Sequence, residues 1–213
     1  MIFADRVEAG ERLAKALVHH AGAGVVVLAI PRGGVIVAEV VARALGAPLD
    51  VVVPRKIGAP GNPELGLGAV APGVRVLDQR IVSLLGVSDA YLEREIAAQE
   101  AEIERREHAY RDGRAGVPVD GRVAIVVDDG VATGGTAVAA LRWARAQGAA
   151  HVVLAVPVAP SQALERLGHE ADEVVVLETP EPFFAVGEWY RDFGQTTDDE
   201  VVAALARAAE LGA

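Results

Sequence analysis

Short, continuous runs of apolar residues, most of them β-branched, recur along the chain between segments with helical patterns. These runs do not alternate apolar with polar residues, which is typical of strands buried on both faces of a parallel sheet. Strands that alternate with helices predict a layered α/β fold, with helices covering the faces of the sheet. The strongest runs are Val25–Ile30, Leu49–Val53, Val123–Val127, Val152–Val156 and Val174–Leu177, and weaker runs are Gly66–Ala71 and Val74–Leu77.

The helices between these runs have recognisable ends. Asp5 and Glu8 have the spacing of a capping box, which predicts a first helix that reaches about His20. The segments Gly34–Leu45 and Thr136–Gln147 are each followed by a glycine. A glycine in that position favours a helix end because it readily adopts the left-handed conformation that closes the last turn.

Two segments interrupt the alternation of strands and helices. A long polar helix is expected over residues 88–112, with Ser88 as its N-cap. Its charges indicate a solvated face, and an arm for oligomer contacts is the alternative. Residues 178–197 hold five of the nine aromatic residues, which favours a structured hood or lid, and a final helix is expected from about Asp198. We expect one domain over residues 1–213.

Composition and charge exclude several classes of protein. The chain has no cysteine, which rules out a disulfide scaffold, a thiolate metal site and a cysteine nucleophile. A formal net charge of −10 repels nucleic-acid phosphates, and the longest apolar run is far shorter than the ~20 residues of a membrane span. Acidic side chains at Asp5, Glu8 and Glu11 are unlike a signal peptide. We therefore expect a cytoplasmic protein that binds neither nucleic acid nor a membrane.

The strongest functional signal is the sequence AIVVDDGVATGGTA at Ala124–Ala137. It predicts a buried strand that ends in two acidic residues, followed by a glycine-rich turn and a helix. The backbone N–H groups of such a turn, together with the helix N-terminus, can surround a phosphate group. The carboxylates of Asp128 and Asp129 would repel that phosphate, so they suit hydroxyl groups, a developing positive charge or Mg2+.

Three other kinds of phosphate or nucleotide site do not fit this segment. Gly130–Thr136 has the glycine spacing of a P-loop, but Thr136 stands where the lysine is required. A dinucleotide-binding fold requires the pattern G-x-G-x-x-G, which is absent. An aspartate-nucleophile phosphatase requires a second aspartate two residues after the first, where Gly130 stands.

The segment resembles the phosphoribosyl pyrophosphate (PRPP) motif of type I phosphoribosyltransferases, in which a hydrophobic strand, two acids and a short spacer precede Thr-Gly-Gly-Thr. A generic strand–turn–helix is the alternative. The resemblance implies that Asp128 and Asp129 hold the ribose 2′ and 3′ hydroxyls and favour the cationic sugar. It also implies a loop that binds the 5′-phosphate. That loop consists of Gly130, Val131, Ala132, Thr133, Gly134, Gly135 and Thr136.

A second segment resembles the short pyrophosphate loop of the same family. The sequence AIPRGG at Ala29–Gly34 follows the first strand, and its backbone amides would hold the diphosphate together with the Arg32 side chain. Taken alone, such a turn can also be purely structural. The residues that correspond to this loop are Pro31, Arg32, Gly33 and Gly34.

A third segment, Val53–Ala71, is similar to the flexible loop that folds over the bound substrate in this family. By this resemblance, Arg55 and Lys56 would close over the leaving pyrophosphate, neutralise it and exclude water. Prolines and glycines make such a loop mobile but restricted. The alternative for Lys56 is an ordinary solvated lysine at the end of a strand.

The resemblance also implies a fold: three α/β/α layers with a small hood. The family's sheet of about six strands is mostly parallel, with the order 3-2-1-4-5-6 and an antiparallel third strand. Strands 1 and 4 are then neighbours where the topology reverses, and ligands bind beyond the carboxyl ends of strands at such a point. In this chain those two strands precede Arg32 and Asp128, so the two loops are expected to meet.

The aromatic segment resembles the base-binding strand of hypoxanthine–guanine phosphoribosyltransferases. The similar residues are Phe184–Gly187, which spell F-A-V-G, and Asp192–Phe193. By resemblance, Phe184 would stack on a base, the backbone of Ala185 would meet the edge of that base, and Asp192 would lie near a metal ion. The alternative is that these aromatic residues only pack the lid.

The motifs disagree on the substrate. Hypoxanthine–guanine enzymes carry an aspartate general base three residues after the second acid, where this chain has Ala132. The sequence Ala-Thr-Gly-Gly-Thr and the pattern Arg55-Lys56-x-Gly58 resemble adenine enzymes instead, but the hood does not. The resemblance therefore identifies a phosphoribosyltransferase of undefined substrate.

The reaction that the resemblance implies is the Mg2+-dependent displacement of pyrophosphate from PRPP by a nucleobase or a similar amine, with a purine favoured over a pyrimidine. Mg2+ would bind mainly through PRPP, and Asp128, Asp129 and Asp192 are its candidate protein ligands. The alternatives are a catalytically inactive PRPP-binding regulator or partner subunit, and a phosphoribosyl hydrolase. The two adjacent acids Asp128 and Asp129, called the acid pair below, are intact, and this favours the transferase. Family members usually form dimers, so a homodimer is expected.

The histidines show no spacing typical of a metal site. His19 and His20 lie at the expected end of the first helix, and His108, His151 and His169 are scattered along the chain. Neither H-x-H nor H-E-x-x-H occurs. The sequence therefore predicts no zinc site.

Overall fold

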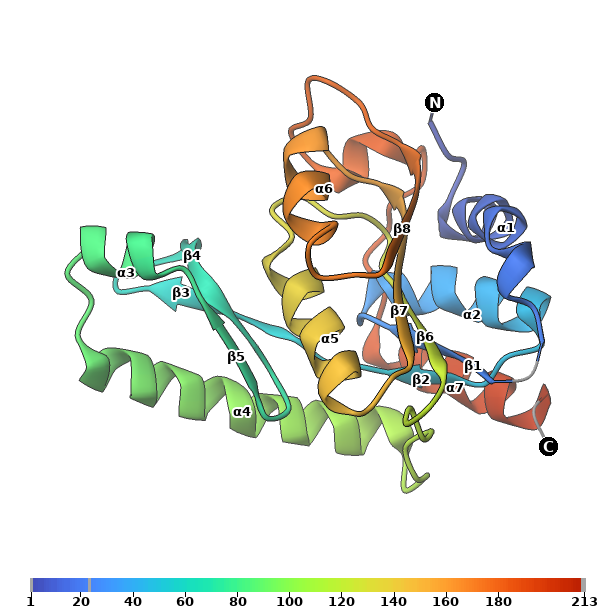
Figure 1. Ribbon diagram of the computed structural model, residues 1–213, viewed down its shortest axis with the longest axis horizontal. Coiled ribbons are helices and arrows are strands. Elements are labelled where there is room, and N and C mark those ends of the chain that lie inside the picture. The colour runs from blue at the N-terminus through green and yellow to red at the C-terminus, as the bar shows by residue number, and fades with distance from the viewer. Residues whose placement is uncertain (1, 23, 212–213) are drawn as a thin grey trace.

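A five-stranded parallel sheet with the order β2-β1-β6-β7-β8 forms the centre of the computed structural model, which describes residues 2–22 and 24–211 (Figure 1). Every neighbouring pair of strands in this sheet is parallel. All five strands coincide with apolar runs in the sequence, so the predicted α/β class and the predicted order of these strands are confirmed. The strands are β1 (Val25–Ala29), β2 (Leu49–Val51), β6 (Val123–Val127), β7 (His151–Val158) and β8 (Glu173–Glu178).

Helices cover both faces of this sheet. Along β1, Val25 and Val27 pack into one hydrophobic core, while Val26 and Leu28 pack into a second core on the opposite face. Because both faces are covered, every residue of β1 is buried, which explains why the run is continuous rather than alternating. The first face is covered by α1 (Arg6–Ala16), α2 (Gly33–Leu45) and α7 (Asp198–Leu211), and the second by α5 (Gly135–Ala146) and α6 (Ser161–Leu167).

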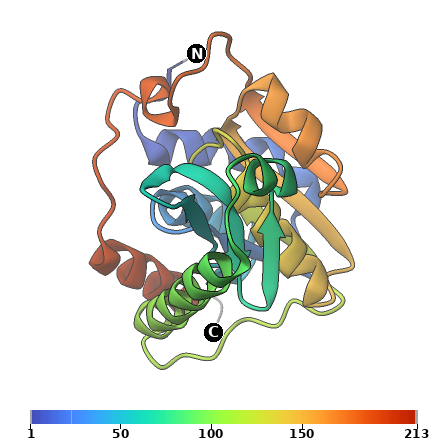
Figure 2. The ribbon, with the colours of Figure 1, turned by 90° about the vertical axis from the view of Figure 1, so that its left-hand side faces the viewer.

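A second, antiparallel sheet with the order β3-β4-β5 lies beside the first. Together with two helices it forms an arm that projects from one side of the main sheet in Figure 1, and Figure 2 views the molecule from the end of that arm. The elements of the arm are β3 (Arg55–Ala59), β4 (Asn62–Ala71), β5 (Val74–Leu77), α3 (Gln79–Leu84) and α4 (Asp89–Arg111).

This second sheet corrects the expected place of the third strand, which the sequence predicted at the edge of the main sheet. Its two candidate segments, in β4 and β5, instead pair with each other across a short turn. Ala69 and Ala71 of β4 pack into the second hydrophobic core, the one that contains the buried face of α5. The outer edge of β2 is occupied in another way, because the Arg111 Nη2 donates to the Val51 carbonyl oxygen at 3.2 Å. A side chain thus satisfies a backbone group that a further strand would have paired.

The segment Val53–Ala71, expected as a flexible loop, is largely a β-hairpin formed by β3 and β4. Its glycines have specific places in that hairpin. Gly61 adopts a positive φ of 74° at the turn, and a Cβ on Gly58 would lie 2.7 Å from the Cα of Pro63, at an irregularity in the strand register. The glycines that suggested mobility therefore serve a tight turn and a close approach of two strands.

Two predicted helix starts agree with the structure. The Asp5 carboxylate accepts a hydrogen bond from the Glu8 amide at the start of α1, and the Ser88 hydroxyl accepts one from the Tyr91 amide at the start of α4. The first helix ends earlier than predicted, at Ala16, and a separate 3-10 turn, η1 (Val18–His20), follows it. Within the described ranges, no helix is both long and apolar enough to cross a membrane.

Candidate functional site

The loops that follow β1 and β6 are in direct contact. The two strands are adjacent and in register, with Ala29 beside Val127, so both loops leave the same edge of the sheet. A Cβ on Gly34 would lie 2.9 Å from the Cα of Asp128, and a Cβ on Gly33 would overlap the Asp129 carboxylate. The two glycines of the Pro31–Gly34 loop are therefore required by the approach of the acid pair.

This contact places backbone N–H groups beside two carboxylates. The peptide bond between Pro31 and Arg32 is cis, and α2 begins at Gly33. The first N–H groups of a helix have no intrahelical partner, so those of Gly33 and Gly34 are available to an anion. The edge of the sheet thus combines amides that attract a phosphate group with acids that attract a cation or hydroxyl groups.

The two acids are electrostatically strained. Burial raises the pKa of Asp128 well above its usual range, and the neighbouring charge of Asp129 raises it further. Burial also raises the pKa of Asp129, although the Arg6 guanidinium opposes that rise. Asp128 Oδ1 accepts a hydrogen bond from the backbone amide of Asp129 at 2.8 Å. Two half-buried carboxylates with raised pKa values favour binding of a positive charge or of hydroxyl donors.

Arg6 is a site residue that sequence reasoning missed. Its Nε lies 2.7 Å from Asp129 Oδ2, and its Nη1 donates to the Gly194 carbonyl oxygen at 2.8 Å. The guanidinium carbon lies 4.0 Å from the centre of the Phe193 ring. No motif surrounds Arg6, so only the folded position of α1 reveals its role.

The hood lies over the acid pair and is joined to the N-terminal segment. Phe3 and Tyr190 form a parallel β-bridge, and their rings lie 5.4 Å apart. The Tyr190 hydroxyl donates to the backbone oxygen of Asp129, and burial raises the pKa of that hydroxyl. A Cβ on Gly130 would lie 2.5 Å from a methyl group of Val186 in the 3-10 turn η2 (Val186–Trp189). The segment 178–197, expected as a hood or lid, therefore contacts the acid pair and the start of the Gly130–Thr136 loop.

A cavity of about 550 Å³ lies beside the predicted 5′-phosphate loop. The whole loop from Gly130 to Thr136 lines it, and Lys56 lines it from the hairpin. Gly134, with a φ of 81°, is the N-cap of α5, so the first amides of that helix are directed to the loop. Arg166 of α6 also lines the cavity, and sequence reasoning missed this second basic residue.

The paired residues Arg55 and Lys56 separate in the structure. Successive side chains of a strand point to opposite faces, so the two cannot both face the cavity. Lys56 Nζ donates to the Glu64 backbone oxygen at the cavity. Arg55 Nε instead donates to Gln99 Oε1 of α4 at 2.8 Å, and burial lowers the pKa of Arg55. The catalytic role of Arg55 stays a prediction.

Arg32 lies on another side of the site. Its Nη1 is 3.8 Å from Asp198 Oδ1, and its side chain lines a separate cavity of about 200 Å³ beside the start of α7. The structure therefore brings the backbone of Gly33 and Gly34 to the acid pair, while the Arg32 side chain is directed toward the end of the hood and the start of α7.

The predicted base-binding residues lie on the surface of the hood. Phe184 is 78% exposed, and Ala185 and Asp192 are exposed as well. Asp192 Oδ1 accepts a hydrogen bond from the Gly194 amide at 3.2 Å. The neighbouring ring of Phe183 stacks on Trp189, so Phe183 rather than Phe184 packs the hood.

The edge of the sheet, its phosphate-type loop and its acid pair define a phosphoribosyltransferase-like site. The chain belongs to the phosphoribosyl transferase family, a family of transferases, because the sequence profile of the phosphoribosyl transferase domain matches residues 3–191. The family and fold predicted from the motifs are thereby confirmed.

Individual relatives extend this result. Two Mycobacterium tuberculosis proteins are each 51% identical over 217 residues, and one is named "Putative phosphoribosyl transferase MT0597". The match covers 100% of this chain and 49% of each relative, so the chain spans about half the length of these curated relatives. The crystal structure of TT1426 from Thermus thermophilus is 48% identical, with a TM-score of 0.83, and the match covers 97% of this chain and 99% of that one.

More distant structures share the fold. The crystal structure of a purine phosphoribosyltransferase from Pyrococcus horikoshii is 16% identical, with a TM-score of 0.50. That match covers 90% of this chain and 93% of the other. At this identity the similarity shows the architecture alone, so substrate preference has to be argued from the site.

Proposed function

We propose that the protein transfers a phosphoribosyl group from PRPP to a nitrogen nucleophile in a Mg2+-dependent reaction. The observation that carries the proposal is the contact of Gly33 and Gly34 with Asp128 and Asp129 at the tips of adjacent strands. It joins amides suited to a diphosphate with acids suited to a ribose, next to the cavity of the Gly130–Thr136 loop. One ligand that carries a phosphate, a sugar and a diphosphate would use all three features.

Each end of PRPP has a matching surface in this proposal. The amides and hydroxyls of the Gly130–Thr136 loop bind the 5′-phosphate, with Arg166 as a nearby positive charge. The Gly33 and Gly34 amides bind the pyrophosphate at the N-terminus of α2. Lys56 lines the cavity of the Gly130–Thr136 loop, and from the hairpin it would approach the leaving group.

The acid pair would act on the sugar. The bond from C1′ to the pyrophosphate oxygen breaks with its electron pair on the pyrophosphate, a new bond forms from C1′ to the nucleophile nitrogen, and that nitrogen loses its proton to solvent. The charges of Asp128 and Asp129 stabilise the positive charge that develops on the ribose. Positioning and charge stabilisation account for the catalysis, since Ala132 offers no general base.

The residues of the site fit a magnesium ion. Mg2+ prefers oxygen ligands and usually keeps substrate phosphates and water in its shell. The carboxylates of Asp128 and Asp129 supply such oxygens at the sheet edge, and Asp192 supplies another on the hood. Bound there, Mg2+ would neutralise pyrophosphate charge.

The nucleophile that fits best is a purine base. The support for this is the resemblance of Phe184–Gly187 to a base-binding segment, together with the 78% exposure of Phe184, which leaves its ring accessible for stacking. A homodimer is proposed from the family alone and is checked by light scattering of the purified chain.

A catalytically inactive PRPP-binding subunit is the second candidate. Two observations favour it: Asp129 is ion-paired with Arg6, and the relatives carry as much chain again outside the matched region. An inactive binder would hold PRPP at the same loops but release no pyrophosphate.

Calorimetric titration of PRPP with and without Mg2+, followed by assays of pyrophosphate release with purines and pyrimidines, tests these proposals. Binding strengthened by Mg2+ and purine-dependent release of pyrophosphate are the expected results. Binding without turnover on any base would select the inactive subunit. Absence of binding would overturn both proposals.

A further inference from the structure

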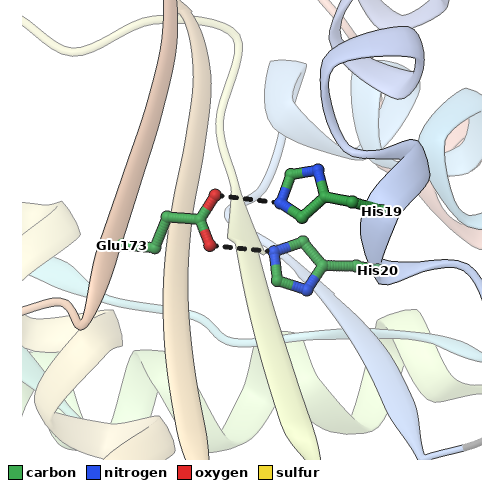
Figure 3. Close-up of side chains that lie close together, drawn as sticks. All are labelled: His19, His20 and Glu173. Atoms are coloured by element: carbon green, nitrogen blue, oxygen red, sulfur yellow. Dashed lines mark hydrogen bonds and ion pairs between the residues drawn. The ribbon is translucent and has the colours of Figure 1, made fainter.

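Two adjacent histidines and a glutamate converge at the end of the sheet opposite the Pro31–Gly34 and Gly130–Thr136 loops. His19 and His20 come from η1, and Glu173 is the first residue of β8 (Figure 3). His19 Nε2 lies 3.1 Å from Glu173 Oε1, and His20 Nε2 lies 3.0 Å from Glu173 Oε2. The sequence predicted no such cluster, because 153 positions separate His20 from Glu173.

These atoms have the spacing of metal ligands. One ligand atom from each of the three residues can be chosen so that all lie within 4.8 Å of one another. Zinc binds histidine nitrogen and carboxylate oxygen at ~2.0–2.2 Å, so ligand atoms in a tetrahedral site are separated by ~3.3–3.5 Å. The two histidine–glutamate separations of 3.1 and 3.0 Å are slightly shorter than this value, so the side chains would have to rotate apart to admit an ion between the two rings and the carboxylate.

A third histidine extends the cluster. His151 is the first residue of β7, its Nε2 lies 4.0 Å from Glu173 Oε2, and its ring centre is 6.4 Å from that of His20. Its other nitrogen, Nδ1, is 3.7 Å from Asp172 Oδ2. A carboxylate beside the distal nitrogen of a histidine is the usual way in which proteins orient a metal-binding imidazole.

The donor set selects a class of metal. Imidazole nitrogens suit zinc, copper, nickel and iron, whereas Mg2+ and Ca2+ prefer oxygen ligands. We propose that His19, His20 and Glu173, with His151 as the fourth ligand, bind one divalent transition-metal ion of the zinc class. The ion joins the end of the α1–η1 segment to the amino ends of β7 and β8.

The position of this site separates it from the proposed reaction. Strands β7 and β8 begin here, whereas the acid pair follows the carboxyl end of the neighbouring strand β6. The site is open to solvent on one side, since the His19 side chain is 54% exposed and that of His20 is 12% exposed. The metal would stabilise the packing of α1, whose first residue, Arg6, contacts Asp129 at the other end.

Titration of ZnCl2 into the full chain, purified without a histidine tag and freed of metal with EDTA, tests the proposal. We expect one Zn2+ per chain in the calorimeter and an increase in Tm that requires the metal. Since loss of an outer-shell partner alone costs ~10–100-fold in affinity, His20→Ala should weaken binding at least ~10-fold. Glu173→Gln should weaken it as well, and Co2+ should give the visible spectrum of a tetrahedral nitrogen–oxygen site.

Matched controls separate a built site from scattered surface histidines. His108→Ala and His169→Ala remove histidines outside the cluster and should leave Zn2+ affinity unchanged. PRPP binding, measured in parallel, should be unchanged by His20→Ala, and circular dichroism checks that the variant folds. If His20→Ala does not fold, His19→Ala and His151→Ala replace it.

Two results would overturn the site. One is the absence of Zn2+ binding to the folded wild-type chain, which would leave only histidine–carboxylate ion pairs at this place. The other is binding of equal affinity in the wild type and in the cluster variants, which would place the ion elsewhere.

Discussion

Arg6 Nε lies 2.7 Å from Asp129 Oδ2, although 123 positions of sequence separate the two residues. The same guanidinium donates a hydrogen bond to the Gly194 carbonyl oxygen and packs on the Phe193 ring. Arg6 therefore connects α1, the acid pair and the hood. Because its positive charge opposes the rise in the pKa of Asp129 that burial causes, Arg6 favours the ionised form of this acid. The N-terminal helix is therefore part of the electrostatics of the site.

Replacement of Arg6 by alanine should shift the pH dependence of the reaction. Without the guanidinium, the pKa of Asp129 rises further, and a smaller fraction of the acid is ionised at a given acidic pH. The acidic limb of the kcat/KM profile should move to higher pH, and activity at neutral pH should fall ~10-fold or more. Lys15→Ala, an exposed change on the same helix, should leave the profile unaltered. An acidic limb at the same pH in Arg6→Ala would show that Arg6 does not influence Asp129.

The parts of the fold and site that could be predicted are those that depend on residues close together along the chain. Buried parallel strands appear as continuous apolar runs, and the Ala124–Ala137 segment carries its acids, glycines and helix start within one short stretch. The adjacency of the two loops followed from the strand order of the family. These features depend on neighbours along the chain or on a topology that the motif identifies.

The features that could not be predicted depend on contacts between distant segments. Arg6 and Arg166 have no local motif, and their positions are determined by how α1 and α6 pack on the sheet. The pairing partner of an apolar run is equally invisible, which is why the β4 strand was expected in the wrong sheet. The side to which Arg55 points depends on the register of the hairpin, and the sequence did not define that register.

Asp128→Asn should stabilise the protein while removing activity. The folded-state pKa of Asp128 is raised, so its contribution to stability is present below the unfolded-state pKa and is lost as pH rises through the folded-state value. At neutral pH the neutral amide should therefore raise Tm, by about 2–4 °C for each ~1 kcal/mol gained. Turnover should fall at least ~10²-fold, because charge aimed at the transition state is lost.

The pH dependence of this effect is the sharper measurement. The difference in Tm between Asp128→Asn and the wild type should shrink as pH falls through the raised pKa, since the wild-type acid is then protonated too. Asp120→Asn, on the surface, should change Tm by no more than the ~0.5 kcal/mol typical of surface substitutions. A wild-type protein more stable than Asp128→Asn at neutral pH would contradict the assigned electrostatic strain.

Gly34→Ala should disrupt the contact between the two loops. The new Cβ would lie 2.9 Å from the backbone of Asp128, which cannot rotate away as a flexible side chain could. PRPP binding should weaken at least ~10²-fold, and Tm should fall with the ~1–3 kcal/mol cost of overpacking. Gly135→Ala, at the first residue of α5, meets nothing within 4 Å and should leave Tm unchanged or slightly higher. Equal Tm values for the two variants would disprove the loop contact.

Lys56→Ala and Arg55→Ala should separate a role in the reaction from a role in folding. Lys56 lines the cavity of the phosphate-type loop, so its loss should lower kcat ~10–10²-fold with an unchanged Tm. Arg55 is bound to Gln99 of α4, so Arg55→Ala should lower Tm by loosening the arm. Urea denaturation and single-turnover kinetics of both variants provide the comparison. A drop in stability of Lys56→Ala equal to that of Arg55→Ala would assign Lys56 to the structure of the hairpin.

Phe184→Ala should weaken the base and spare PRPP. Phe184 is 78% exposed, so removal of its ring costs the fold little, whereas a ring that stacks on a base contributes ~1–3 kcal/mol to binding that base. The KM for a purine should therefore rise ~5-fold or more, while the affinity for PRPP and the Tm remain those of the wild type. Phe183→Ala is the matched control, because the Phe183 ring stacks on Trp189 and its loss should lower the stability of the hood. An equal loss of affinity for PRPP and for the base in Phe184→Ala would mean that Phe184 maintains the hood rather than contacting the nucleophile.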